Sequence, residues 1–124
     1  MSVISESEML VMKCIWSAGK AISSKEIVSL MKNQFGKDYK HTTVCTFLTR
    51  LKQKKFVDFT IHGKVHLYFP LVSEKDYLSG QLSDFKELWF DGSVKNLIAA
   101  FCEDEKLSTE EIAEIRKLIN ELDE

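Results

Sequence analysis

Residues 40–54 constrain the fold most, because a helix formed by this segment has one apolar face and one polar face. With about 100° of rotation per residue, one side of a helix here carries the apolar residues Val44, Phe47, Leu48 and Leu51. The opposite side carries Thr42, Cys45, Thr46, Thr49, Arg50 and Gln53. A helix of this kind packs by its apolar stripe. Its free face has short polar side chains, which suit a close approach to the floor of a DNA groove.

Two further helices are marked upstream by capping sequences. Residues 5–8 read Ser-Glu-Ser-Glu, the spacing of a capping box, and predict a helix over about 6–17. Residues 23–26 repeat the pattern and predict a second helix over about 24–34. With the helix at about 42–54, the first part of the chain is expected to hold three helices.

A β-hairpin is expected next. Residues 56–61 and 65–69 are rich in β-branched and aromatic side chains, and His62-Gly63-Lys64 forms a turn between them. Pro70 is expected to end the second strand, because proline cannot continue a ladder of hydrogen bonds. Three helices followed by a hairpin are the order of a winged helix-turn-helix. We therefore predict a mainly α fold with a small β-hairpin, in which residues 1–72 are a winged-helix DNA-binding domain.

Residues 73–124 have a different character and predict three more helices. About 50 residues cannot bury so many large apolar side chains by folding on themselves, whereas two packed copies can. We expect a helical dimerisation domain here and a homodimer; the alternative is that these helices fold back on the first 72 residues. The candidate dimerisation residues are Leu82, Phe85, Trp89, Val94, Leu97, Ile98, Phe101, Ile112, Ile115, Leu118 and Ile119.

The net charge of −2 conceals a strong asymmetry. Residues 1–72 hold eleven Lys/Arg against five Asp/Glu, a formal charge of +6. Residues 73–124 hold six against fourteen, a formal charge of −8. A basic half favours binding to nucleic acid. The alternative is that the two halves differ by chance or attract each other.

The residues expected to contact double-stranded DNA surround the third helix. The second helix of a helix-turn-helix lies in the major groove with its N-terminal end toward the bases. That end presents Thr42, Thr43, Cys45 and Thr46. Phosphate contacts are expected from Ser24, Lys25, Lys40, His41, Arg50 and Lys64. Two alternatives stay open: the threonines are solvated helix positions, and Lys52, Lys54 and Lys55 serve only the C-terminal end of the helix dipole.

Several other classes of protein are disfavoured. Cys14, Cys45 and Cys102 are far apart in the sequence and form no CxxC pair, so neither a disulfide framework nor a cysteine-rich metal site is expected. Cys14 and Cys102 are expected in the core. The three histidines have no metal-ligand spacing, and we expect no metal and no cofactor. Cys45, near lysine and histidine, leaves a thiol-based redox-sensing regulator as an alternative. A winged-helix protein-interaction module is the other.

Catalysis and membrane insertion are also not expected. The sequence has no glycine-rich phosphate loop, no HExxH and no nucleophile elbow, so an enzyme is not predicted. No apolar run approaches the roughly 20 residues of a membrane span. Because the first residues lack the basic and then apolar pattern of a signal peptide, we expect a cytoplasmic protein.

An ordered set of motifs over about 115 residues resembles the penicillinase-repressor family, the BlaI/MecI/CopY group. Residues 4–16 resemble that family's first helix with its terminal tryptophan, and residues 43–51 resemble its recognition helix. Residues 68–72 resemble the end of its wing. Trp89-Phe90-Asp91-Gly92-Ser93, with the apolar residues that follow, resembles its C-terminal dimerisation region.

The resemblance implies a homodimeric repressor on a palindromic operator that controls resistance or stress genes. By position, Thr42, Cys45 and Thr46 correspond to base-reading positions. The family often has lysine, arginine or glutamine at two of these, so the operator sequence stays open. β-Lactam-responsive members are inactivated by proteolysis at an Asn-Phe bond, in a pathway that starts from a membrane sensor-protease. Ala100 and Phe101 occupy that place here, so the position matches but the asparagine is missing.

Overall fold

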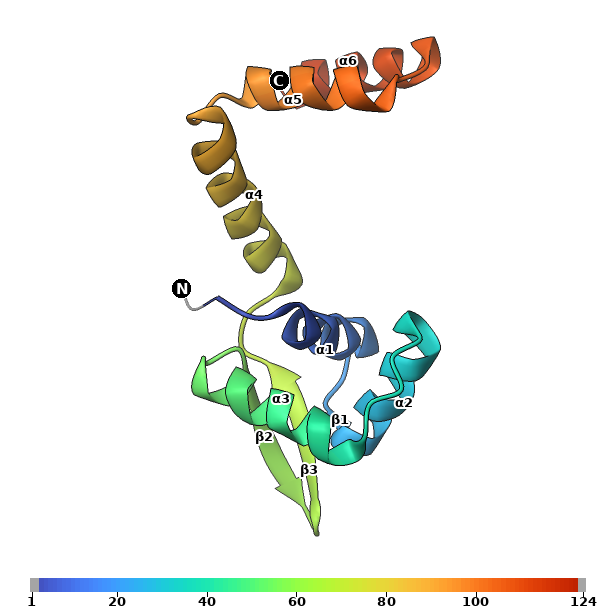
Figure 1. Ribbon diagram of the computed structural model, residues 1–124, viewed down its shortest axis with the longest axis vertical. Helices are drawn as coiled ribbons and strands as arrows, with labels where there is room; N and C mark the ends of the chain where they lie inside the picture. Colours follow the sequence, from blue (N-terminus) through green and yellow to red (C-terminus); the bar gives the residue numbers. More distant parts are fainter. Residues whose placement is uncertain (1–2, 123–124) are drawn as a thin grey trace. The chain divides into compact units, whose positions relative to one another are not determined.

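The computed structural model describes residues 3–122, and for residues 104 and 105 only the backbone. Figure 1 shows the order of its elements. These are α1 (Glu6–Ala18), β1 (Ile22–Ser23), α2 (Ser24–Phe35), α3 (His41–Gln53), β2 (Val57–His62), β3 (Val65–Pro70), α4 (Glu74–Phe90), α5 (Val94–Glu105) and α6 (Thr109–Leu122). The predicted order of three helices, a hairpin and three further helices is confirmed. The chain forms two compact units, divided between Leu78 and Ser79.

The capping sequences start the helices as predicted, with one difference. At α1 the Ser5 hydroxyl accepts from the Glu8 backbone N–H at 3.1 Å, and Glu8 Oε1 accepts from the Ser5 N–H at 2.8 Å. At α2 the Ser23 hydroxyl accepts from the Glu26 N–H at 3.2 Å. The Glu26 carboxylate accepts a hydrogen bond from the Ser23 hydroxyl at 3.3 Å. In a complete capping box it would accept from the backbone N–H of Ser23 instead. Ser23 is also the last residue of β1.

The sheet has three strands, one more than the hairpin predicted from the sequence. Its order is β1-β3-β2, with antiparallel pairs throughout, and Ile22 lies opposite Tyr68. Pro70 is the last residue of β3 and lies opposite Val57, so the strand extends one residue beyond the predicted end. Proline has no N–H to donate. The next donor, the Leu71 N–H, reaches the Phe56 carbonyl at 2.8 Å and fastens this end of the hairpin.

The core of the first unit lies between its three helices and the sheet. The predicted stripe on α3 supplies Val44, Leu48 and Leu51, all 0% exposed, and Phe47 is half-buried beside them. Cys14 is buried as predicted, and burial raises the pKa of its thiol to about 11. The other fully buried apolar side chains are Val11, Met12, Ile15, Ile22, Ile27, Met31, Phe56 and Val57.

The first residues of α4 belong to this unit. Tyr77 is buried, with its ring centroid 5.9 Å from that of Trp16 and 5.6 Å from that of Phe56. The Trp16 Nε1–H donates to the Val72 carbonyl at 2.8 Å. These contacts fix the chain where it leaves the sheet, so the winged-helix fold extends to the first turn of α4.

The second unit contains the rest of α4 together with α5 and α6. Asp91 and Gly92 have φ of 48° and 82°, left-handed values that break the helix where the sequence predicts. Ser108 and Glu111 make a complete capping box at the start of α6, with bonds of 3.1 and 3.2 Å. Cys102 is only half-buried and was expected in a core; among the described side chains of residues 79–122, none is buried. No helix in the described chain is long and apolar enough to cross a membrane.

Candidate nucleic-acid interface

The free face of α3 has the residues that its helical periodicity predicts. Thr42, Thr46, Thr49 and Arg50 are exposed, whereas Cys45 is half-buried. On the other side of α3, Thr43 is half-buried and most of the apolar stripe is fully buried. The exposed face of α3 is therefore lined mainly by short hydroxyl side chains, with one arginine after them.

Two of these threonines are held by the helix itself. The Thr46 hydroxyl donates to the Thr42 carbonyl at 3.0 Å, and the Thr49 hydroxyl donates to the Cys45 carbonyl at 2.9 Å. A hydroxyl that has donated its proton keeps lone pairs for accepting hydrogen bonds. Each of these side chains therefore offers an acceptor oxygen and a methyl group, in a rotamer fixed by the backbone.

The first turn of α3 is joined to the first turn of α2. The Ser24 hydroxyl and His41 Nε2 are 2.6 Å apart, and Cys45 Sγ is 3.6 Å from the same nitrogen. The N-cap residue of α3, Lys40, makes no side-chain cap. The N-terminal ends of two helices, each with the positive end of its dipole, thus meet near His41.

A groove of about 490 Å³ lies between these helix ends and β3, the central strand of the sheet. It brings together five residues predicted to contact DNA: Ser24, Lys25, His41, Cys45 and Lys64. Its other lining residues are Ser23, Val65, His66 and Tyr68. No carboxylate is among the lining residues. Burial and, to a smaller degree, the charge of Cys45 raise the pKa of Tyr68, which forms part of the wall.

The remaining predicted contacts lie outside this groove. Lys40, Thr42 and Arg50 are exposed on α3 or next to it, with Thr43 half-buried and Thr46 exposed on the same helix. Sequence reasoning did not select His66 as a DNA contact. Strand alternation could have found it, because His66 lies two residues before Tyr68 and so shares its face of the sheet.

Two of the three lysines at the end of α3 pair with carboxylates of the protein itself. Lys54 Nζ donates to the carboxylate of the buried Glu8, so Lys54 is a structural residue. Lys52 Nζ lies 3.6 Å from Asp58 Oδ1 and 5.5 Å from the centroid of the Phe59 ring. Lys55 is exposed and has a φ of 65°, where the chain turns from α3 into β2. The alternative that all three lysines serve only the helix dipole therefore does not hold for Lys54.

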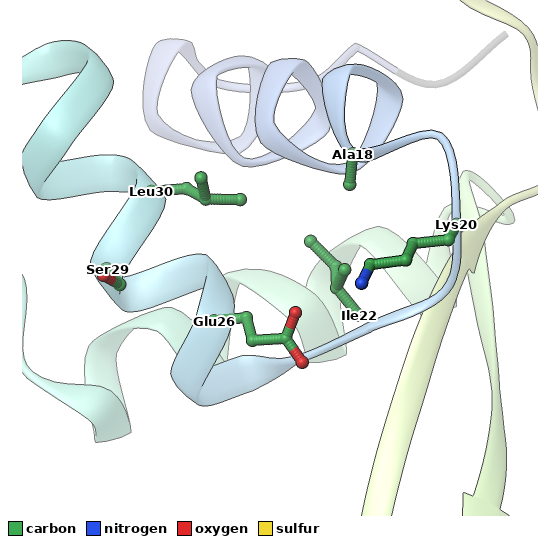
Figure 2. A pocket seen from close by; sticks show the side chains of 6 residues that line it. All are labelled: Ala18, Lys20, Ile22, Glu26, Ser29 and Leu30. Atoms are coloured by element: carbon green, nitrogen blue, oxygen red, sulfur yellow. The ribbon is translucent and has the colours of Figure 1, made fainter.

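A second concavity, of about 310 Å³, lies where α1, β1 and α2 meet. Figure 2 shows Leu30 and Lys20 reaching into it from opposite sides, with Ile22 between them. Ala18, Glu26 and Ser29 complete the lining. The six residues include no histidine, no cysteine and one carboxylate, so this pocket has no arrangement for acid–base or nucleophilic chemistry.

The sequence matches known proteins over almost all of its length. The family model described as penicillinase repressor matches residues 4–121. The methicillin resistance regulatory protein MecI of Staphylococcus aureus is 34% identical over 117 residues, which are 94% of this chain and 93% of MecI. The penicillinase repressor of Bacillus licheniformis is 30% identical over 118 residues, which are 95% of this chain and 90% of that repressor. The first of these relatives is named as a regulator of methicillin resistance and the second as a repressor, and neither is named as an enzyme.

Solved structures match the first unit. A solution structure of the DNA-binding domain of the repressor BlaI is 31% identical with a TM-score of 0.51, and the match covers 60% of this chain and 87% of that domain. The monomeric form of Bacillus licheniformis BlaI, solved in complex with the blaP half-operator, is 30% identical with a TM-score of 0.50. That match covers 61% of this chain and 89% of the other. The predicted winged-helix fold is confirmed by these neighbours.

Proposed function

Because the chain belongs to the penicillinase repressor family, we propose that it is a homodimeric transcriptional repressor that binds palindromic operator DNA. The observation that carries the proposal is the free face of α3, with short hydroxyl side chains on a basic domain. The domain similar to it in BlaI was solved on a half-operator, which supports the same mode of binding here. α3 would lie in the major groove and the β2–β3 hairpin beside it.

The hydroxyl geometry indicates how bases would be read. Thr46 offers an acceptor oxygen and a methyl group, because its proton is given to the helix. Those groups fit the amino groups of adenine or cytosine and the methyl group of thymine. Thr42, Thr43 and Cys45 would contribute to the same reading. Arg50, about one turn further along, would meet phosphate. Phosphate contacts would also come from Lys40 and from Ser24, Lys25, His41 and Lys64.

Residues 1–72, with the first turn of α4 packed against them, would be the DNA-binding domain, and the rest of residues 73–124 the dimerisation domain. The apolar side chains that support dimerisation are uncovered in one chain: Leu82 is 55% exposed, Trp89 67% and Phe101 57%. Val94, Phe85, Ile98, Ile112, Leu118 and Ile119 are also exposed, and Leu97 and Ile115 are half-buried. Exposed apolar patches of this kind mark surfaces where proteins associate. A second copy of the chain would cover them and would present two α3 helices to the two half-sites of one operator.

The regulated genes would be resistance or stress genes, and the repressor would be released by proteolysis near Ala100 and Phe101. Both residues lie inside α5, and Phe101 is exposed. A protease binds its substrate as an extended strand, so cleavage here would first require α5 to open locally. Cutting at this position would remove α6 and five of the eleven proposed dimerisation residues, which would weaken binding to an operator with two half-sites. The protease would act in a pathway that begins with a membrane sensor.

Two measurements test the proposal together. Genome-wide mapping of the sites bound by the tagged protein is expected to give a short palindrome upstream of a few genes. Sedimentation of the purified full chain at micromolar concentration is expected to give dimers. A protein that sediments as single chains and enriches no genomic fragment would contradict the proposal.

A further inference from the structure

The groove between α3 and the wing has the chemistry of an anion site. Its polar lining comes from three separate elements: Ser24 and Lys25 from α2, His41 from α3, and Lys64 and His66 beside or on β3. Two of these residues are cations and two are imidazoles, and no acidic residue lines the groove to oppose them. The first turns of α2 and α3 add the positive ends of two helix dipoles.

His66 is the one residue of this set whose orientation is fixed by an aromatic neighbour. Its ring lies parallel to the ring of Phe59, with an interplanar angle of 5° and a centroid separation of 4.2 Å. The two residues sit diagonally across β2 and β3, because Phe59 pairs with Tyr68 and His66 pairs with Ile61. Stacking on Phe59 covers one face of the imidazole and leaves its nitrogen-bearing edge free. Within residues 3–122, no protein hydrogen bond engages those nitrogens.

The position of the groove indicates which part of a DNA duplex would enter it. A helix in the major groove has a phosphate backbone along each of its sides. In Figure 1 the β2–β3 hairpin passes α3 and its turn projects beyond the helices. A strand of DNA bordering the major groove therefore has to pass between α3 and this hairpin, over the residues that line the groove.

We propose that the groove holds a backbone phosphate of the bound DNA, and that His66, oriented by Phe59, donates a hydrogen bond to it. This inference rests on the proposed function, because it names a contact made by the same DNA-binding face. Lys25 and Lys64 supply charge on either side, and His41 is held in place by the Ser24 hydroxyl at 2.6 Å. Since a phosphate contact carries no base information, His66 adds affinity for any DNA sequence.

The test is fluorescence anisotropy of the full chain with a labelled duplex of random sequence at low salt. We expect His66→Ala to bind about tenfold more weakly than the wild type, as for the loss of one hydrogen bond to a charged group. His66→Gln retains most of the affinity because its amide N–H can donate. Phe59→Leu loses affinity as well, since it removes the ring that stacks on His66, and Phe59 is not itself a lining residue of the groove. Thr60→Ala, exposed on the opposite face of β2, is the matched control and binds as the wild type does.

The outcomes separate this inference from the proposed function. If the wild type does not bind the duplex, the proposed function fails and the inference fails with it. If the wild type binds and His66→Ala binds equally well, only the phosphate site is wrong. If His66→Ala is weakened but Phe59→Leu is not, the orienting role of Phe59 is wrong. Thermal unfolding followed by circular dichroism checks that each variant is folded, and His66→Gln gives the answer if His66→Ala does not fold.

Discussion

Lys54 Nζ donates to both carboxylate oxygens of Glu8, at 2.8 and 3.2 Å, and to the Val3 carbonyl oxygen at 2.9 Å. The Glu8 side chain is 2% exposed and that of Lys54 is 28% exposed. Glu8 lies in the first turn of α1, and Lys54 is the C-cap residue of α3. The pair therefore connects the start of one helix to the end of the helix that carries the threonine face.

Replacing Glu8 by Ala is expected to lower the free energy of unfolding by about 1–3 kcal/mol. The change removes the acceptor for the Lys54 ammonium and for the Ser5 N–H, and hydrogen bonds to charged groups are worth about this much. Urea denaturation followed by circular dichroism measures the effect. Glu6→Ala is the matched control, because Glu6 is exposed in the same helical turn and should change stability by less than about 1 kcal/mol. Equal effects of the two substitutions would mean that the pair with Lys54 adds nothing.

The same carboxylate predicts a dependence of stability on pH. Burial alone would raise the pKa of Glu8, but hydrogen bonds from Lys54 and Ser5 and the charge of Lys54 outweigh it, so its pKa lies below the ordinary 4.5. A carboxyl group with a pKa lowered by folding adds stability above its unfolded pKa, and that stability is lost as pH falls through the lowered value. The stability advantage of the wild type over Glu8→Gln should therefore be constant near neutral pH and shrink below about pH 4.5. Urea titrations of both proteins between about pH 3 and pH 7 measure it; an advantage that persists unchanged at the acid end would contradict it.

Much of the fold could be predicted from the sequence because its signals are local. The Ser5 and Glu8 capping box lies within four consecutive residues, and the apolar stripe of α3 repeats at helical spacing. β1 could not be predicted, because a strand of two residues has no periodicity. Its existence depends on a partner strand more than 40 residues later in the chain.

In the candidate site, too, the local features could be predicted from the sequence and the contacts between distant residues could not. The threonine face follows from the rotation of one helix, so the sequence is sufficient for it. The partners of individual side chains are not local: Lys54 and Glu8 are 46 positions apart, and Ser24 and His41 are 17 apart. A run of lysines at a helix end does not show which of them forms an ion pair with a buried carboxylate. His66 was missed for the same reason, because its neighbour Phe59 lies on the other strand of the hairpin.

Two substitutions on α3 are expected to separate affinity from sequence preference. Arg50→Ala should weaken binding to every duplex and make the slope of log affinity against log salt concentration less negative by about 0.9, the share of one phosphate contact. Thr46→Ala removes an acceptor oxygen and a methyl group, so it should change the preferred sequence at one position by about 1–3 kcal/mol. Selection from a random DNA pool measures the preference, and salt titrations measure the slope.

Lys117→Ala is the control for that pair of experiments. Lys117 is an exposed cation on α6, in the acidic half of the chain, and its loss should leave both the salt slope and the sequence preference unchanged. If Arg50→Ala behaves like Lys117→Ala, Arg50 does not contact phosphate. An unaltered consensus for Thr46→Ala would mean that Thr46 does not read a base.

Placing a charge on α6 tests the proposed dimer. Leu118 is 57% exposed in the single chain, and Leu118→Asp would bury a carboxylate wherever that side chain enters an interface. We expect the dissociation constant of the dimer to rise by at least about a hundredfold, close to 3 kcal/mol, in sedimentation equilibrium. Binding to a palindromic operator should weaken while binding to one half-site stays the same, because the winged helix is untouched. Glu114→Gln, an exposed change on the same helix, should leave the dimer intact. Full-strength dimers of Leu118→Asp would remove Leu118 from the interface.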